Sequence, residues 1–144
     1  MKTLGSSKVF FLVLALAIRS CSSEGFLTWN VQIVNGLSGG NTLFLHCKSE
    51  DNDLGIHNLA VGAKFSWDFT PNVWGTTLYW CYLRNNEEHK WFDAFLSQSD
   101  DGYNGFARSC NYKTCTWIAR DDGIYLRNIP NKSDDFVHKW EPGQ

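Results

Sequence analysis

The sequence predicts an all-β protein: an antiparallel β-sandwich of about seven or eight short strands, stapled by two disulfides. Three observations support this. Apolar side chains recur at every second residue, turn-forming residues separate these stretches at intervals of roughly 8–15 residues, and an even number of cysteines remains once an N-terminal signal is set aside. A period of two places one face of a strand on a core, and evenly spaced short strands are typical of sandwiches and barrels.

Individual strands follow from this alternation. The clearest stretches are residues 29–33, 43–48, 65–69 and 115–120, and residues 91–96 and 124–128 complete the set. Residues 76–83 are apolar on both faces, which predicts a central strand. Asp122-Gly123 suits a tight turn with positive φ and predicts a hairpin between residues 114–120 and 124–128. No stretch keeps helical spacing over three turns.

Residues 1–22 read as a secretory signal peptide. Lys2 and Lys8 give a basic start, residues 9–18 are an unbroken apolar run, and small residues follow. Ser20, Ser22 and Ser23 are alternative cleavage positions, and cleavage after Ser22 is favoured. A run that ends at Arg19 is shorter than the roughly 20 residues a membrane span needs. We therefore expect residues 23–144 to form one secreted domain that does not insert into a membrane.

Cleavage after Ser22 removes Cys21 and leaves four cysteines, which predicts two disulfides in an exported chain. Cys110 and Cys115 flank a short polar loop, so a local bond between them is plausible. Cys47 would then pair with Cys81, both on predicted strands. Four cysteines allow three pairings, so this connectivity is a hypothesis.

The charge argues against nucleic acid as a partner. Without residues 1–22 the chain has 10 Lys and Arg against 15 Asp and Glu, and it has no basic cluster that could follow a phosphate backbone. Asn131-Lys132-Ser133 is an N-glycosylation acceptor sequence in a predicted loop.

No catalytic or metal centre stands out, so we expect no enzyme, cofactor or metal. His46 precedes Cys47, but neighbouring residues on a strand point to opposite faces. Residues 49–55 gather Glu50, Asp51 and Asp53, whose oxygens could hold Ca²⁺. The interpretation that we favour is a solvated acidic loop whose side chains cap turns.

The aromatic residues divide into two groups. Trp67, Trp80 and Trp117 lie in alternating stretches and are predicted to belong to the core. Trp74 and Tyr103 lie in predicted loops, where a ring could stack on a sugar or anchor a protein partner.

Several segments together resemble the plant self-incompatibility protein family, also called S-protein homologues. They are VQIVN at 31–35, HCKSEDNDLGIH at 46–57, GAKFSWDF at 62–69, GTTLYWC at 75–81, FDAF at 92–95, Cys110, Cys115 with Trp117, and DGIY at 122–125. The resemblance implies a small secreted plant protein with four cysteines and a β-sandwich. One class of members acts as a pistil determinant recognised by a pollen membrane receptor. The histidine-containing segment of self-incompatibility ribonucleases is absent.

The expected function is that of an extracellular signalling or recognition ligand, expected to be a monomer, that binds a plasma-membrane receptor through its loops. Polar loops on a rigid frame can vary without disturbing the core. The candidate loops are residues 50–58, 84–90, 97–104 and 128–135, and their candidate recognition residues are Glu50, Asp51, Asp53, Glu87, Glu88, Asp100, Asp101 and Tyr103. The alternative function is an extracellular carbohydrate-binding module, suggested by the abundant tryptophan.

Overall fold

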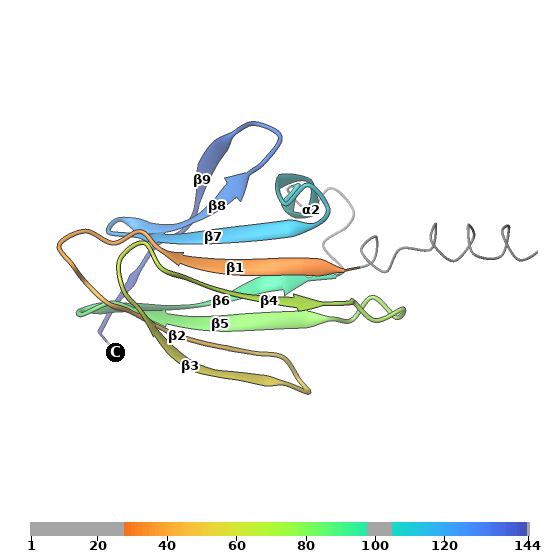
Figure 1. Ribbon diagram of the computed structural model, residues 1–144, viewed down its shortest axis with the longest axis horizontal. Coiled ribbons are helices and arrows are strands. Elements are labelled where there is room, and N and C mark those ends of the chain that lie inside the picture. Colours follow the sequence, from red (N-terminus) through yellow and green to blue (C-terminus); the bar gives the residue numbers. More distant parts are fainter. Residues whose placement is uncertain (1–27, 98–104, 144) are drawn as a thin grey trace, which may run out of the picture.

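The computed structural model describes residues 28–97 and 105–143, which form two five-stranded sheets packed face to face (Figure 1). The strand order is β4-β1-β7-β8-β9 in one sheet and β10-β6-β5-β2-β3 in the other. The predicted fold class, an all-β sandwich with two disulfides, is confirmed. The signal-peptide prediction for residues 1–22 lies outside the described residues.

The first sheet contains β1 (Trp29–Asn35), β4 (Lys64–Phe69), β7 (Thr114–Arg120), β8 (Gly123–Asn128) and β9 (Ser133–His138). The second contains β2 (Leu43–Lys48), β3 (Asp53–Leu59), β5 (Leu78–Arg84), β6 (Glu88–Leu96) and β10 (Glu141–Pro142). A short helix, α2 (Phe106–Ser109), precedes β7. All strand pairs are antiparallel except β1 and β7, which run parallel.

The core lies between the sheets and follows from the alternation. In β2 and β5 every second side chain is buried, and β5 occupies the centre of its sheet as predicted. Trp67 and Trp117 are buried, which confirms their predicted place in the core. The indole Nε1 of Trp117 donates a hydrogen bond to the backbone oxygen of Ala94 across the interface, at 3.0 Å. This bond joins the two sheets and satisfies a polar group that burial would otherwise make costly.

Trp80 is a correction to the predicted core. It is half-buried and lies on the outer face of β5, because its neighbours Tyr79 and Cys81 point inward. A strand alternates its side chains strictly, so Trp80 cannot share their face. Its ring belongs to the surface.

A buried amide fixes the β1–β2 connection. Asn35 is 1% exposed, and its Nδ2 donates to the backbone oxygens of Asn41 (2.9 Å) and Leu59 (2.8 Å). Its Oδ1 accepts the backbone N–H of Leu37 at 2.9 Å. One side chain thus ties the end of β1 to the start of β2 and the end of β3.

The β7–β8 hairpin forms where it was predicted, but for a different reason. Arg120 pairs with Gly123, so the turn residues are Asp121 and Asp122. Gly123 lies in β8, where a Cβ would come within 2.4 Å of the Phe136 ring and 2.6 Å of the His138 oxygen. Glycine is required there by the close approach of β9.

The loops divide between the two ends of the sandwich (Figure 1). One end carries the connections β2–β3, β4–β5 and β8–β9, together with α2, and we call it the long-loop end. The opposite end carries the connections β1–β2, β3–β4, β5–β6 and β7–β8. Polar loop residues that could bind a partner therefore lie at the two ends of the sandwich, about one strand length apart.

Three of the predicted loops are longer than the loops in the structure, because strands take up part of their residues. Residues 53–59 form strand β3, residue 88 begins β6, and residue 133 begins β9. Asp53 and Glu88 are consequently strand residues, while Glu50, Asp51 and Glu87 remain in loops. Asp100, Asp101 and Tyr103 lie outside the described residues.

Candidate recognition surface

The β4–β5 connection at the long-loop end is held by one side chain, that of Asn72. Its Nδ2 donates to Thr76 Oγ1 (2.9 Å), and its Oδ1 accepts the backbone N–H of Thr76 (3.0 Å). Its backbone N–H donates to Thr77 Oγ1 at 2.8 Å. Gly75, with φ of 70°, allows the chain to turn back where a side chain would be strained. These bonds fix the shape of the loop.

The tip of this loop presents two apolar side chains to solvent. Val73 is 91% exposed and Trp74 is 82% exposed, the highest values among the large hydrophobic residues that the structure describes as exposed. Tryptophan is enriched among residues that dominate binding energy at protein interfaces. A tryptophan on a fixed loop loses little conformational freedom when a partner covers it, so Trp74 is suited to act as an anchor.

A groove lies beside this loop. It has a volume of about 520 Å³, and its lining comes from the β2–β3 loop, the β4–β5 loop and the start of β5. Glu50 and Asp51 are its charged lining residues, and the aromatic residues Phe69, Tyr79 and Trp80 also line it. The β2–β3 loop is closed by the Ser49 backbone N–H, which donates to the Asn52 oxygen at 2.8 Å. The groove is therefore acidic, with aromatic side chains on the β5 side.

Asp53 has a structural role next to the groove. Its Oδ1 accepts the backbone N–H of Gly55 at 2.8 Å and lies 2.6 Å from His46 Nε2. The Gly55 hydrogen bond first, and His46 second, hold the pKa of Asp53 below 3.8. This carboxylate is occupied in holding the start of β3, so it is less available to a partner than Glu50 or Asp51.

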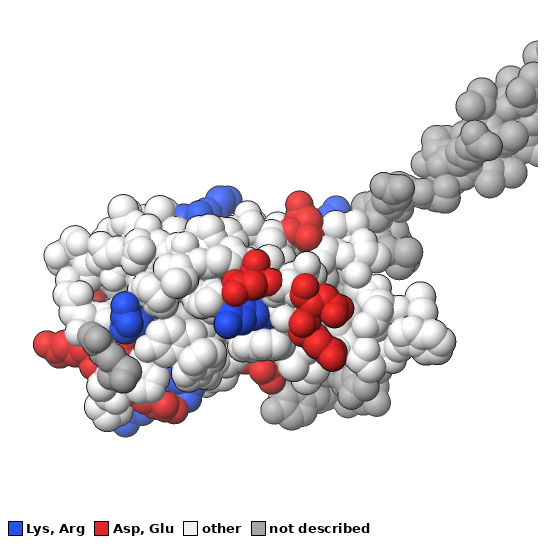
Figure 2. Space-filling model, turned by 90° about the horizontal axis from the view of Figure 1, so that it is seen from below, with Lys and Arg blue, Asp and Glu red and all other residues white. Residues whose placement is uncertain are grey.

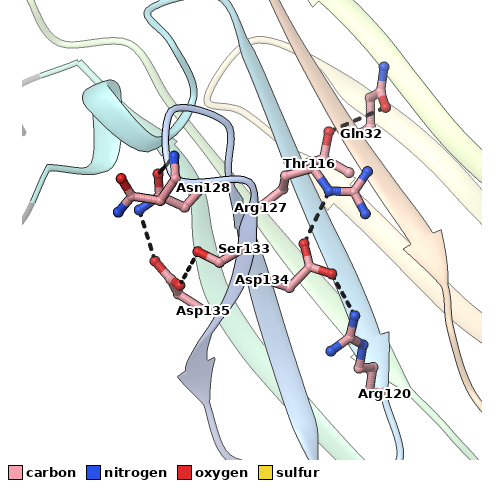
Figure 3. Close-up of polar contacts among 9 residues, drawn as sticks. Gln32, Thr116, Arg120, Arg127, Asn128, Ser133, Asp134 and Asp135 are labelled. Atoms are coloured by element: carbon pink, nitrogen blue, oxygen red, sulfur yellow. Dashed lines mark hydrogen bonds and ion pairs between the residues drawn. The ribbon is translucent and has the colours of Figure 1, made fainter.

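The β8–β9 hairpin reaches the same end on the other sheet and is braced by polar contacts (Figure 3). Asp134 accepts hydrogen bonds from Arg120 Nη2 and, at 3.1 Å, from Arg127 Nε. Asp135 accepts from Asn128 Nδ2 at 3.1 Å and from Ser133 Oγ at 3.0 Å. Asn131, the predicted glycosylation site, is exposed at the tip of this hairpin. Its backbone N–H donates to Asn128 Oδ1 at 3.1 Å.

The candidate residues are thus only partly brought together. Glu50 and Asp51 join the groove, with Asp53 beside it, whereas Glu87 and Glu88 lie at the opposite end in the β5–β6 hairpin. Within residues 28–97 and 105–143, no three His, Cys, Asp or Glu side chains converge in a way that could hold a metal ion. The same residues include no helix with the length and hydrophobicity needed to cross a bilayer.

A family model described as plant self-incompatibility protein S1 matches residues 30–140. The chain belongs to this family. S-protein homolog 74 and S-protein homolog 1 of Arabidopsis thaliana are each 41% identical to it over 120 residues, which cover 80% of this chain and 73% of each relative. S-protein homolog 29 of the same plant is 34% identical over 139 residues, covering 94% of this chain and 97% of that protein.

A solved structure supports the fold of this S-protein homologue. It matches with a TM-score of 0.59 at 20% identity and covers 79% of this chain and 95% of that one. That structure represents Self-Incompatibility Protein Homologue proteins, a family of small, highly stable, secreted proteins from plants. The family assignment and the sandwich fold therefore agree.

Sequence reasoning singled out Trp74 but did not single out Val73 or Asn72, and it placed Trp80 in the core. Asn72 follows Pro71, and this Pro-Asn pair was a turn signal that could have been read. The groove itself could not be foreseen, because it requires the β2–β3 and β4–β5 loops to lie side by side. That neighbourhood depends on the packing of one sheet on the other.

Proposed function

We propose that this S-protein homologue is a secreted recognition ligand that docks its long-loop end on a cell-surface receptor protein. The single observation that carries the proposal is the exposed Val73-Trp74 tip, held by Asn72 beside an acidic groove. Val73 and Trp74 together form an exposed apolar tip, and exposed apolar surface rimmed by polar residues marks interaction sites. The receptor surface that fits this arrangement has an apolar pocket for Trp74 and basic side chains facing Glu50 and Asp51.

The two parts of this surface would contribute differently to binding. Burial of the Trp74 ring supplies affinity, since aromatic anchors account for most of the energy of typical interfaces. Glu50 and Asp51 are exposed carboxylates, so they act mainly on the association rate and on partner choice. Binding should therefore weaken as salt is raised, because salt screens exposed charges over about 8 Å at physiological ionic strength.

The experiment measures binding of the purified, oxidised protein to plasma-membrane vesicles from plant tissue that responds to it. Trp74→Ala should weaken binding at least tenfold and leave the melting temperature unchanged, because the ring is exposed. Trp91→Ala provides the matched control, since Trp91 is also an exposed tryptophan (58%) but lies on the outer face of β6.

Charge reversal tests the groove. Glu50→Lys with Asp51→Lys should slow association, whereas Glu87→Lys at the opposite end should not. Saturable vesicle binding that neither Trp74→Ala nor the double reversal alters would overturn the proposal.

The proposed role requires no chemical step, and we propose that the protein is not an enzyme. His46 and Cys47 illustrate the reason: Cys47 is fully buried and bonded to Cys81, while His46 lies on the outer face of β2. Incubation with RNA and simple esters would test this directly. Turnover that persists in rigorously purified protein would contradict it.

A further inference from the structure

The outer face of the β10-β6-β5-β2-β3 sheet carries a row of side chains that the proposed function does not use. Ile56 pairs with His46, His46 pairs with Tyr82, and Tyr82 pairs with Trp91, so one row crosses β3, β2, β5 and β6. Trp91 and Ile56 are each 58% exposed. We call these four residues, with neighbouring Phe44, the sheet-face strip. Figure 2 looks onto this layer of the sandwich and shows charged side chains of both signs scattered among uncharged areas.

The rings of the strip contact one another and are therefore held in place. The centroids of Tyr82 and Trp91 are 4.6 Å apart, and those of Phe44 and Tyr82 are 6.0 Å apart. Arg84 lies 4.2 Å over the ring of Phe44, which fixes its guanidinium at the surface. Rings supported in this way present hydrophobic area at low entropic cost.

Hydrogen-bonding groups of both charge signs surround the rings. Asp53 lies 2.6 Å from His46 and 4.0 Å from Lys48, and Arg84 and Asp93 stand on the same outer face. Two basic side chains, Lys48 and Arg84, thus balance two acidic ones, Asp53 and Asp93. A third carboxylate at the β10 edge, Glu141, is paired with Lys90 at 2.9 Å. A face with balanced charge offers no net attraction to a polyanion such as nucleic acid or an anionic membrane.

We propose that the sheet-face strip binds a neutral, β-1,4-linked polysaccharide chain. Each hexopyranose unit has an apolar face of C–H groups and a rim of hydroxyls, which matches rings interleaved with donors and acceptors. Neighbouring strands lie about 4.8 Å apart, close to the length of one unit in such a chain. A glycan lying across β2, β5 and β6 would place successive units over successive strands.

The strip fits a glycan better than it fits a protein surface. Protein interfaces have a fully buried core from which charged residues are depleted. In the strip, by contrast, polar and charged side chains stand between the rings: His46 is paired with Tyr82, and Arg84 is paired with Phe44. The strip lies on the face of the sheet, whereas Val73 and Trp74 lie on a loop at the end of the sandwich, so the two sites use different rings and one molecule could bind a glycan and a receptor together. This site is independent of the proposed receptor contact.

Isothermal titration of the full oxidised protein with cellohexaose and mannohexaose tests the inference, with a polygalacturonate oligomer as the anionic comparison. We expect saturable binding of at least one neutral oligosaccharide, weakened at least tenfold by Trp91→Ala. Trp74→Ala is the matched control and should bind as the wild type does. Trp91 is exposed, so its removal should leave the near-ultraviolet circular dichroism of the core intact.

Tyr82→Phe distinguishes stacking from hydrogen bonding, since it keeps the ring and removes the hydroxyl; binding should fall by less than for Trp91→Ala. Three results would overturn the inference: no saturable binding of either neutral oligosaccharide at millimolar ligand, equal binding by Trp91→Ala and wild type, or preferential binding of polygalacturonate. Self-association abolished by Trp91→Ala would also overturn it, because a second copy would then cover the strip.

Discussion

Cys47 and Cys81 lie directly opposite each other on β2 and β5, and their disulfide joins strands whose cysteines are 34 residues apart in sequence. The second bond joins Cys110 to Cys115, only 5 residues apart, at the end of α2. This is the pairing that the sequence favoured among three. All four cysteines are fully buried.

The two disulfides should contribute unequally to stability. In the chain-entropy model the longer loop is worth about 3.8 kcal/mol and the shorter one about 2.2 kcal/mol. We therefore expect Cys47→Ala with Cys81→Ala to lower the free energy of unfolding more than Cys110→Ala with Cys115→Ala. Urea denaturation of both double variants checks this order. A larger loss for the Cys110 and Cys115 pair would contradict it.

Trp117 and Trp67 provide a matched comparison of buried indoles. Trp117 Nε1 donates to Ala94, whereas Trp67 Nε1 has no hydrogen-bond partner among the described residues. Replacing either ring with phenylalanine removes similar volume, but only Trp117→Phe also breaks a hydrogen bond. We expect it to destabilise the fold by about 1 kcal/mol more than Trp67→Phe. Equal losses in chemical denaturation would show that the bond contributes nothing.

Asn35→Ala should be strongly destabilising. The substitution leaves the backbone groups of Leu37, Asn41 and Leu59 without their side-chain partner, two of them acceptors and one a donor. At roughly 1 kcal/mol for each lost bond, the expected loss is about 3 kcal/mol. Asn58→Ala, on the exposed outer face of β3, is the control and should change stability by less than about 0.5 kcal/mol. Similar melting temperatures for the two variants would refute the role of Asn35.

His138 makes stability depend on pH. Burial beside the rings of Phe92 and Trp117, and secondarily the charge of Lys90, lower its pKa below 6.5, while Asp93 acts in the opposite direction. The unfolded chain therefore takes up this proton more readily, and the free energy of unfolding should fall as pH drops through 6.5.

The measurement is urea denaturation at pH 7.5 and at pH 5 for the wild type and His138→Gln. The variant should lose less stability between these conditions, because it lacks the group. Other titrating residues cancel in the comparison, so parallel pH profiles would exclude His138 as the cause.

Sequence reasoning predicted the strands in which apolar and polar residues alternate clearly. It missed the strands in which this alternation is weak. The bounds of β2 and β7 match the expected stretches, because every second residue there is apolar. The sequence pattern predicts a loop over most of β3, which starts with Asp53, Leu54 and Gly55, and β9 contains mostly exposed residues. Neither strand shows the apolar face on which the prediction depended.

Other features depend on contacts between distant segments. The parallel pairing of β1 with β7 cannot be read from either strand alone. The groove beside Trp74 forms only when two loops meet. The outward position of Trp80, by contrast, was available from the sequence: a buried Cys81 forces its neighbour to the opposite face.

Photo-crosslinking tests the central claim most directly. A photoreactive amino acid replaces Val73 at the long-loop end or Val61 at the opposite end, both exposed valines (91% and 48%). After irradiation on plasma-membrane vesicles, we predict a specific membrane-protein adduct from position 73 that excess unlabelled wild type abolishes, and none from position 61. Adducts from position 61 alone, or equal adducts from both positions, would contradict recognition by the long-loop end.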